Sequence, residues 1–286
     1  MGETYRQISK IARTKSQLLR FSRSELFAGL FILGCANGLA GRVIHTVDQL
    51  GLANAILDTF GISVIVLTAC FLGISFIFDD ENDEIRSADI AVSAVILLLI
   101  ILPVSAMGWL AVTALSLYIL LFTTANKLCR RGAKVLLAVT VPMLWSRLLF
   151  DVFTNFILEL DASLVALMLG TYRSGNLVEF VDHSGTLLIL SSCSSLANAS
   201  LAMLWWVTIS QVVRHRSCHE DILWCLLACG SVVALNVTRL TFMGLSHSLY
   251  DAIHSTVGNI AANAITLGLT VLICMLGVRR EVFSRA

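Results

Sequence analysis

The fold class is decided by residues 87–125, SADIAVSAVILLLIILPVSAMGWLAVTALSLYILLFTTA, in which Asp89 is the only charged residue. A helix needs about 20 mainly apolar residues to cross the hydrocarbon core of a bilayer. This stretch is long enough for two crossings, and Pro103 to Gly108 supply a turn between them. We therefore predict two membrane helices here, at 87–104 and 107–125.

The rest of the chain has the same character, with 57% hydrophobic and only 14% charged residues. Soluble domains carry roughly 25% charged residues, so this chain has too little polar surface to face water. We expect an all-α polytopic membrane protein with a single transmembrane domain at 25–280, a cytoplasmic N-terminal segment at 1–24 and a cytoplasmic tail at 281–286. The apolar runs predict about eight transmembrane helices: 26–44, 53–78, 87–104, 107–125, 133–156, 193–213, 221–245 and 254–277.

The distribution of Lys and Arg predicts the orientation. The N-terminus and the loops at 126–134 and 214–220 are rich in these residues, whereas the loops near 45–52 and 245–253 contain none. Cytoplasmic loops carry an excess of Lys and Arg. We therefore expect both termini in the cytoplasm, which agrees with an even number of spans.

Composition also bears on partners and cofactors. The net charge is only +1, without a basic patch interleaved with aromatics, so we expect the lipid bilayer and no nucleic acid as a partner. Most of the eight cysteines lie in apolar runs, where Cys packs as a small hydrophobe. His215, Cys218 and His219 lack a second ligand pair at zinc-site spacing, so we predict no metal site. We expect no other cofactor.

One long outer segment, at 157–192, precedes the sixth predicted span. Its second half, from Gly175 to Leu190, is partly β-branched and is interrupted at residues 183–185, which favours a small extracytoplasmic β-hairpin. Its first half, Asp161 to Leu169, indicates a short separate helix at the membrane interface.

Three polar residues fall at one predicted depth, on the outer side of three consecutive spans. Cys193 begins the sixth span, Arg239 lies near the outer end of the seventh, and His254 begins the eighth. A Cys and a His on neighbouring helices can act as nucleophile and base, and an Arg beside them can stabilise an oxyanion. Asn236 shares a helix face with Arg239. These residues predict cysteine acyl transfer at the outer membrane surface.

Simpler interpretations remain open for each residue. Cys193 could be a packing cysteine, Arg239 could reach to the interface with its long side chain, and His254 could be a structural histidine, with His247 as its competitor. In the fifth span, Arg147 and Asp151 are four residues apart and predict a structural ion pair. Arg42 and Asp58 are candidates for a similar role in the first two spans.

The region from about 141 to 280 resembles the exosortase/archaeosortase family of membrane cysteine transpeptidases. The order and spacing of several short motifs carry the resemblance. They are Pro142, Gly175-Asn176, the hairpin with Gly185, Cys193-Ser194-x-Leu196, Asn236-x-x-Arg239 and His254-x-x-x-Gly258.

The resemblance implies a catalytic half at 141–280, with Cys193, Arg239 and His254 as the catalytic residues and Asn236, Ser194 and Gly258 in substrate-binding or supporting positions. Family members cleave exported proteins that end in a sorting tail (PEP-CTERM-like): a short signature, a transmembrane helix and a basic end. The expected partners are therefore proteins with such tails. This chain differs from the common family pattern in having Ser195 where a Gly usually follows the Cys-Ser pair.

Two other functions compete with this hypothesis. Charged residues inside the spans, Arg42, Arg147, Asp151 and Arg239, could line the path of a small-molecule transporter. The chain could instead be a non-catalytic scaffold of an exopolysaccharide system.

Overall fold

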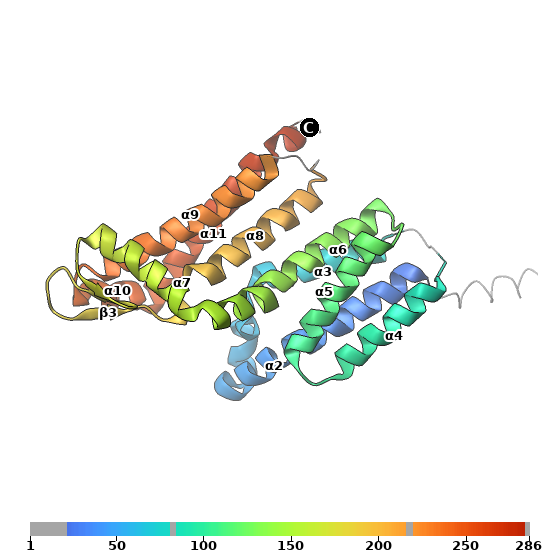
Figure 1. Cartoon of the computed structure of the whole chain (residues 1–286), viewed down its shortest axis with the longest axis horizontal. Helices are drawn as coiled ribbons and strands as arrows, with labels where there is room; N and C mark the ends of the chain where they lie inside the picture. The colour runs from blue at the N-terminus through green and yellow to red at the C-terminus, as the bar shows by residue number, and fades with distance from the viewer. Residues whose placement is uncertain (1–21, 81–83, 216–219, 284–286) are drawn as a thin grey trace, which may run out of the picture. The chain divides into compact units, whose positions relative to one another are not determined.

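The computed structural model describes residues 22–80, 84–215 and 220–283, and most of them are helical (Figure 1). The predicted cytoplasmic segments at 1–24 and 281–286 lie mainly outside the described residues, as do Cys218 and His219. Within the described residues, five helical stretches are long and apolar enough to cross a membrane: Arg23–Leu57, Ser105–Phe122, Lys127–Leu169, Glu220–Met243 and Val257–Arg279. Val64–Phe78 and Ser87–Ile101 are shorter apolar helices. The chain is thus a helical membrane protein, while the count of eight spans stays a prediction.

The chain forms two compact units, and the first comprises the described residues of Met1–Gly41 and Gly73–Ala133. The predicted turn at Pro103–Gly108 is confirmed, because one helix ends at Ile101 and the next begins at Ser105. The unit contains the first part of α2 (Arg23–Leu57), the end of α3 (Val64–Phe78), α4 (Ser87–Ile101), α5 (Ser105–Phe122) and the start of α6 (Lys127–Thr140).

Helices α2 and α5 approach each other closely through glycines. A Cβ added at Gly108 of α5 would come within 2.6 Å of the Gly38 backbone nitrogen on α2 and 2.7 Å of the Gly34 carbonyl oxygen. Trp109 donates its indole N–H to the Gly38 carbonyl at 3.0 Å. Because small residues let membrane helices pack backbone to backbone, these glycines fix the contact between α2 and α5.

A buried carboxylate, Asp89, marks the start of α4. It accepts hydrogen bonds from the Arg86 backbone N–H at 2.9 Å and from the Tyr118 hydroxyl at 2.8 Å. Arg23 donates from Nη2 at 2.9 Å, and its Nε lies 2.9 Å from the other carboxylate oxygen. The Arg23 and Asp89 side chains are only 4% and 0% exposed, so this charge pair is buried and satisfied within the protein.

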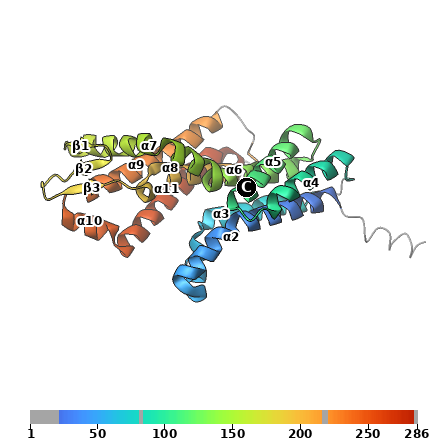
Figure 2. The same cartoon turned by 60° about the horizontal axis from the view of Figure 1, so that its bottom comes forward.

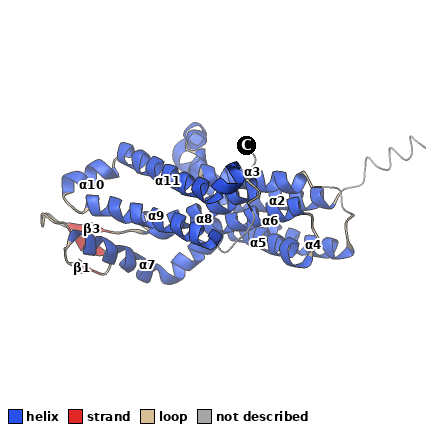
Figure 3. Cartoon of the chain, turned by 90° about the horizontal axis from the view of Figure 1, so that it is seen from above, coloured by secondary structure: helices blue, strands red, loops and turns tan. Residues whose placement is uncertain are grey.

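The second unit comprises Arg42–Leu72 and the described residues of Lys134–Ala286. In it, α8, α9 and α11 run alongside one another, with α10 and a small sheet at one end (Figure 3). Its further elements are η1 (Thr59–Gly61), the π-helical turn η2 (Val141–Trp145), α7 (Ser146–Leu169), β1 (Arg173–Ser174), β2 (Leu177–Glu179), β3 (Thr186–Leu188), η3 (Ser191–Cys193), α8 (Ser195–Val212), α9 (Glu220–Met243), α10 (His247–His254) and α11 (Thr256–Phe283).

The run predicted as one helix at 53–78 is interrupted. Helix α2 ends at Leu57, a 3₁₀ turn follows, and α3 begins only at Val64. Side chains of α2 accommodate the break: Thr46 donates its hydroxyl to the Phe60 carbonyl at 3.1 Å, and Arg42 donates Nη1 to the Gly61 carbonyl at 3.2 Å. Carbonyls left without a helical partner are thereby satisfied.

Helix α7 corrects a second prediction. Asp161 to Leu169 are not a separate short helix but the end of α7, which bends at Phe153 and is capped by Gly170 with φ of +69°. At its start, α7 continues from α6 through the π turn around Pro142. Proline has no backbone N–H and clashes with the preceding turn, and a π turn accommodates such a defect without ending the helix.

The predicted hairpin is a three-stranded antiparallel sheet in the order β1-β2-β3, next to α7 (Figure 2). Gly175 and Asn176 form the turn between β1 and β2, where Gly175 has φ of +59°. Asn176 also donates its side-chain amide to the Ile189 carbonyl at 2.9 Å. Val178 pairs with Leu187 across β2 and β3, so one face of the sheet is apolar.

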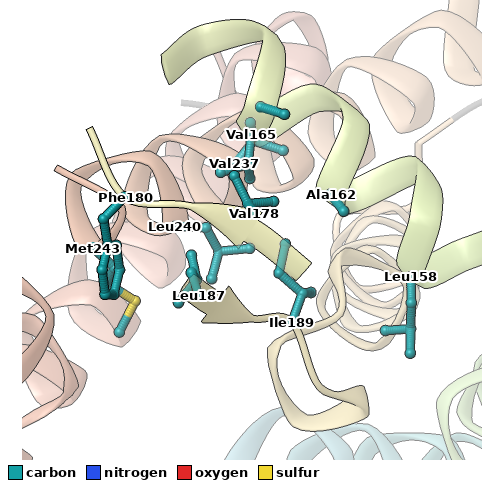
Figure 4. Packing of buried hydrophobic residues seen from close by; sticks show 11 residues of the cluster. Leu158, Ala162, Val165, Val178, Phe180, Leu187, Ile189, Val237, Leu240 and Met243 are labelled. Atoms are coloured by element: carbon teal, nitrogen blue, oxygen red, sulfur yellow. The ribbon is translucent and has the colours of Figure 1, made fainter. Parts of the chain in front are cut away.

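That apolar face packs against α7 and α9 to form a core cluster (Figure 4). Cys193, Tyr250 and Ile253 pack against the edge of this cluster. The core thereby gathers the turn η3, the end of α9 and helix α10, which carry the predicted catalytic residues. Its buried members are Leu158, Ala162, Val165, Ala166, Val178, Phe180, Leu187, Ile189, Val237, Leu240 and Met243.

Candidate active site

Cys193 is the last residue of the 3₁₀ turn η3, directly before α8. The backbone N–H groups around it are already engaged. Those of Cys193 and Ser194 donate to the carbonyls of Leu190 at 2.9 Å and Ser191 at 3.2 Å. The N–H of Ser195 donates to the carboxylate of Asp161 at 3.0 Å. If the thiol attacks a carbonyl group, the resulting oxyanion therefore needs a hydrogen bond from a side-chain donor rather than from these amides.

Asn236 connects this turn to α9. Its side-chain amide donates to the Cys193 carbonyl at 2.7 Å and to the Ser195 hydroxyl oxygen at 3.1 Å. Ser195 is buried and takes part in this contact. It occupies the position where the family that this region resembles usually has Gly. Ser194 caps α8 by accepting the Leu196 N–H at 3.3 Å. Asn236 thus fixes the backbone that carries the thiol.

Arg239 lies one helical turn after Asn236 on α9. Its Nη2 donates to the Asn259 side-chain oxygen of α11, while its Nε is buried without a hydrogen-bond partner among the described residues. Asn259 in turn donates its amide to the His254 carbonyl at 2.8 Å. The Arg239 guanidinium is therefore held in place through Nη2, and its Nε–H has no hydrogen-bond acceptor among the described residues.

His254 ends α10 rather than beginning the last span, because Ser255 separates α10 from α11. Its exposed ring stacks on Tyr250, with 5.2 Å between ring centroids and 8° between ring planes. The ring nitrogens make no hydrogen bond to the described residues. The competitor His247 contacts Asp251 at 3.4 Å instead. His254 thus keeps its ring nitrogens available to a substrate.

A cavity of about 450 Å³ adjoins these residues and is lined by α8, α9, α10 and α11. Asn236, Arg239 and Gly258 line it, confirming that Asn236 and Arg239 share a face. A Cβ added at Gly258 would come within 2.4 Å of the Ile253 carbonyl, so the junction of α10 and α11 requires Gly there. Cys193 and His254 do not line the cavity but adjoin it, through Asn236 and Ile253 respectively.

The loop between β2 and β3 carries its own charge network. Glu179 lies 2.8 Å from Nδ1 of His183, and this contact raises the pKa of His183 above its usual value. The hydroxyl and backbone N–H of Ser184 donate to Asp182 and lower the pKa of that carboxyl. These groups are solvent-exposed, so they stabilise the loop rather than take part in the site.

The ion pairs predicted inside the spans are wrong. Arg147 and Asp151 form no ion pair with each other in the described chain, and both line a second cavity instead. Arg42 donates to a backbone carbonyl and not to Asp58. Four-residue spacing places two side chains on one face, but here it does not bring Arg147 and Asp151 into contact.

The described residues contain no group of three or more His, Cys, Asp or Glu that could hold a metal ion. His215 contacts Asp221 at 2.6 Å, whereas the other two residues of the sequence cluster, Cys218 and His219, lie outside the described chain.

Two functional candidates were missed by the sequence reasoning. Asn259, which holds Arg239, lies with Asn263 in an otherwise apolar stretch of α11. Asp161, whose carboxylate binds the first turn of α8, lies in the apolar end of α7. Polar residues in apolar spans are candidates by default, so this signal was present for both.

Comparisons with protein-family models, curated proteins and solved structures found no match. The functional argument therefore depends on the geometry of the site.

Proposed function

We propose that the protein is a membrane-embedded cysteine protease/transpeptidase of the exosortase type. One observation carries this proposal: asparagine side chains fix the backbone at Cys193 and at His254, and one of them also holds Arg239. Asn236 contacts Cys193, and Asn259 joins Arg239 to His254.

In the proposed reaction, His254 takes the proton of the Cys193 thiol. The sulfur attacks the carbonyl carbon of the scissile peptide bond, the C–N bond breaks, and the leaving amine takes the proton from His254. An acceptor nucleophile, an amine, a hydroxyl or water, then attacks the thioester and releases the thiol. The proposed reaction uses no metal ion or organic cofactor.

Arg239 is the proposed oxyanion donor. The backbone amides of residues 193–195 are occupied, so they cannot supply the hydrogen bonds that this intermediate needs. The buried Nε of Arg239 is an unused donor on a permanent cation. Fixed donors aimed at a developing charge are often the largest catalytic term.

The proposed substrates are exported proteins with a C-terminal sorting tail (PEP-CTERM-like), whose transmembrane helix shares the bilayer with the enzyme. The sheet β1–β3, next to the Cys193 turn in sequence, is a candidate surface for an extended scissile segment. The proposal includes eight spans, both termini in the cytoplasm, and a site on the outer face of the cytoplasmic membrane.

The test is cleavage of a tail-bearing protein from the same genome by full-length Cys193→Ala, with Cys225→Ala as the matched control. Cys225 is a half-buried cysteine that packs against the cluster around Trp206, away from the site. We expect Cys193→Ala to lose activity on the order of 10³-fold or more and the control to retain it. Undiminished cleavage by folded Cys193→Ala rejects the assignment.

A transporter of small anions is the second candidate. It is favoured by Arg42, Arg147 and Asp151, which line one cavity, although Arg239 lines another. A transport path predicts flux of the anion into protein-containing vesicles that Arg147→Gln abolishes and Cys193→Ala leaves intact.

A further inference from the structure

The second cavity has a volume of about 470 Å³ and belongs to the second unit. It is lined by α2, the start of α3 with the residue before it, η2, the start of α7, the turn that carries Cys193 and the start of α8. Its apolar wall includes Val66, Phe150 and Leu201. Its polar lining residues that bear on ligand binding are Arg42, Ser63, Arg147, Asp151, Ser191 and Ser194.

The charged side chains of this cavity are not neutralised by one another. Arg147 and Asp151 make no side-chain hydrogen bond or ion pair with the described residues. Arg42 uses Nη1 for the Gly61 carbonyl at 3.2 Å, which leaves its other N–H groups. Two cations and one carboxylate line the cavity, and this net positive charge favours an anionic ligand.

The hydroxyl groups add donors rather than acceptors. The oxygen of Ser63 accepts the Ile65 N–H at 3.3 Å, and that of Ser194 accepts the Leu196 N–H at 3.3 Å. Because these bonds leave the hydroxyl hydrogens unused, both serines can donate to a ligand. Ser191 is exposed and lines the same cavity.

We propose that this cavity binds a phosphate ester through Arg42 and Arg147, assisted by Ser63 and Ser194. Guanidinium groups bind phosphate oxygens in paired N–H···O contacts. Two guanidinium groups and two serine hydroxyls together provide more hydrogen-bond donors than the two oxygens of a carboxylate can accept. The site does not depend on the acyl-transfer reaction, since neither arginine takes part in the Cys193 network.

The phosphate ester has two possible sources, a phospholipid headgroup or a soluble metabolite. The apolar wall suits the glycerol and acyl carbons of a lipid, whereas the polar lining suits either. Short-chain dihexanoyl phosphatidic acid and sn-glycerol 3-phosphate carry the same phosphate monoester and differ only in the acyl chains, so they separate the two sources. Dihexanoylglycerol, which lacks the phosphate, is the uncharged control probe.

The experiment measures binding of each probe to full-length protein in phosphate-free detergent by native mass spectrometry. We expect Arg42→Gln and Arg147→Gln to weaken binding roughly tenfold or more, since each removes charge-assisted hydrogen bonds. Asp151→Asn should tighten binding, because it removes a negative charge from the cavity. Arg279→Gln, an exposed arginine at the end of α11, is the matched control and should bind like wild type.

Opposite signs for the arginine and aspartate variants separate binding from loss of folding. Tighter binding by Asp151→Asn cannot come from an unfolded protein. Preference for the phosphatidic acid probe identifies a lipid site, and preference for glycerol 3-phosphate identifies a soluble ligand. The proposal is overturned if neither phosphate probe binds saturably, if dihexanoylglycerol binds as well, or if Asp151→Asn weakens binding.

Discussion

The two units place their charged side chains in different environments. In the first unit, Asp89 receives hydrogen bonds from Arg23, Arg86 and Tyr118, and the Arg23–Asp89 pair is almost fully buried. In the second unit, Arg147 and Arg239 line cavities and have no carboxylate partner among the described residues. The difference separates charges that hold the helices together from charges that remain available to a ligand.

The same amino-acid types therefore predict different consequences of mutation. A satisfied charge pair contributes to folding, because removal of one partner leaves the other buried and unpaired. A charge that lines a cavity contributes little to folding but determines what binds or reacts there.

The largest expected effect is on stability, in the first unit. Asp89→Ala leaves Arg23 buried without its carboxylate and should cost about 3–5 kcal/mol of folding free energy. Thermal unfolding in detergent measures it, with Asp151→Ala as the comparison in the second unit. An equal loss of stability in both variants would contradict the division between the two units.

The next effect is on catalysis, in the second unit. Arg239→Gln should lower kcat by about 10²–10³-fold with little change in the unfolding temperature. Cleavage kinetics on a tail-bearing substrate measure it. Partial recovery in Arg239→Lys would indicate a role for the charge, whereas a fall in unfolding temperature matching that of Asp89→Ala would indicate a structural arginine.

A smaller effect is expected at Asn259, which positions Arg239 without being the proposed oxyanion donor. Asn259→Ala should lower kcat by roughly tenfold, because a misplaced catalytic group loses part of its effect, and should leave KM nearly unchanged. Asn263→Ala, one turn later on α11 and lining the same cavity, is the control. A change confined to KM would assign Asn259 to substrate binding.

The smallest effect concerns the loop between β2 and β3. Glu179 raises the pKa of His183 in the folded state. The contact therefore stabilises the folded protein fully at pH values below the unfolded histidine pKa of about 6.5. This stabilisation is lost as the pH rises through the pKa of the folded state. The unfolding temperature should therefore fall slightly over this range. Glu179→Gln should remove that dependence, and NMR titration of the His183 ring should show a lower pKa. An unchanged His183 titration in the variant would exclude the contact as its cause.

Local signals in the sequence were sufficient for part of the candidate site. Asn236 and Arg239 could be placed on one face, because three-residue spacing fixes direction on a helix. The spacing of Arg147 and Asp151 gave an equally valid local inference and a wrong pairing, because the cavity beside α7 lies between segments distant in sequence. Asn259 was missed for the same reason, since its partner Arg239 is on another helix.

The sequence by itself determined that this is a helical membrane protein, because apolar composition and run length are properties of the chain alone. It also located the turn at Pro103–Gly108 and the strands before Cys193, which depend on neighbouring residues. Only the tertiary structure decided which charges are satisfied. Asp89 and Asp151 both lie in apolar helices, but hydrogen bonds from other elements satisfy Asp89, whereas Asp151 lines a cavity.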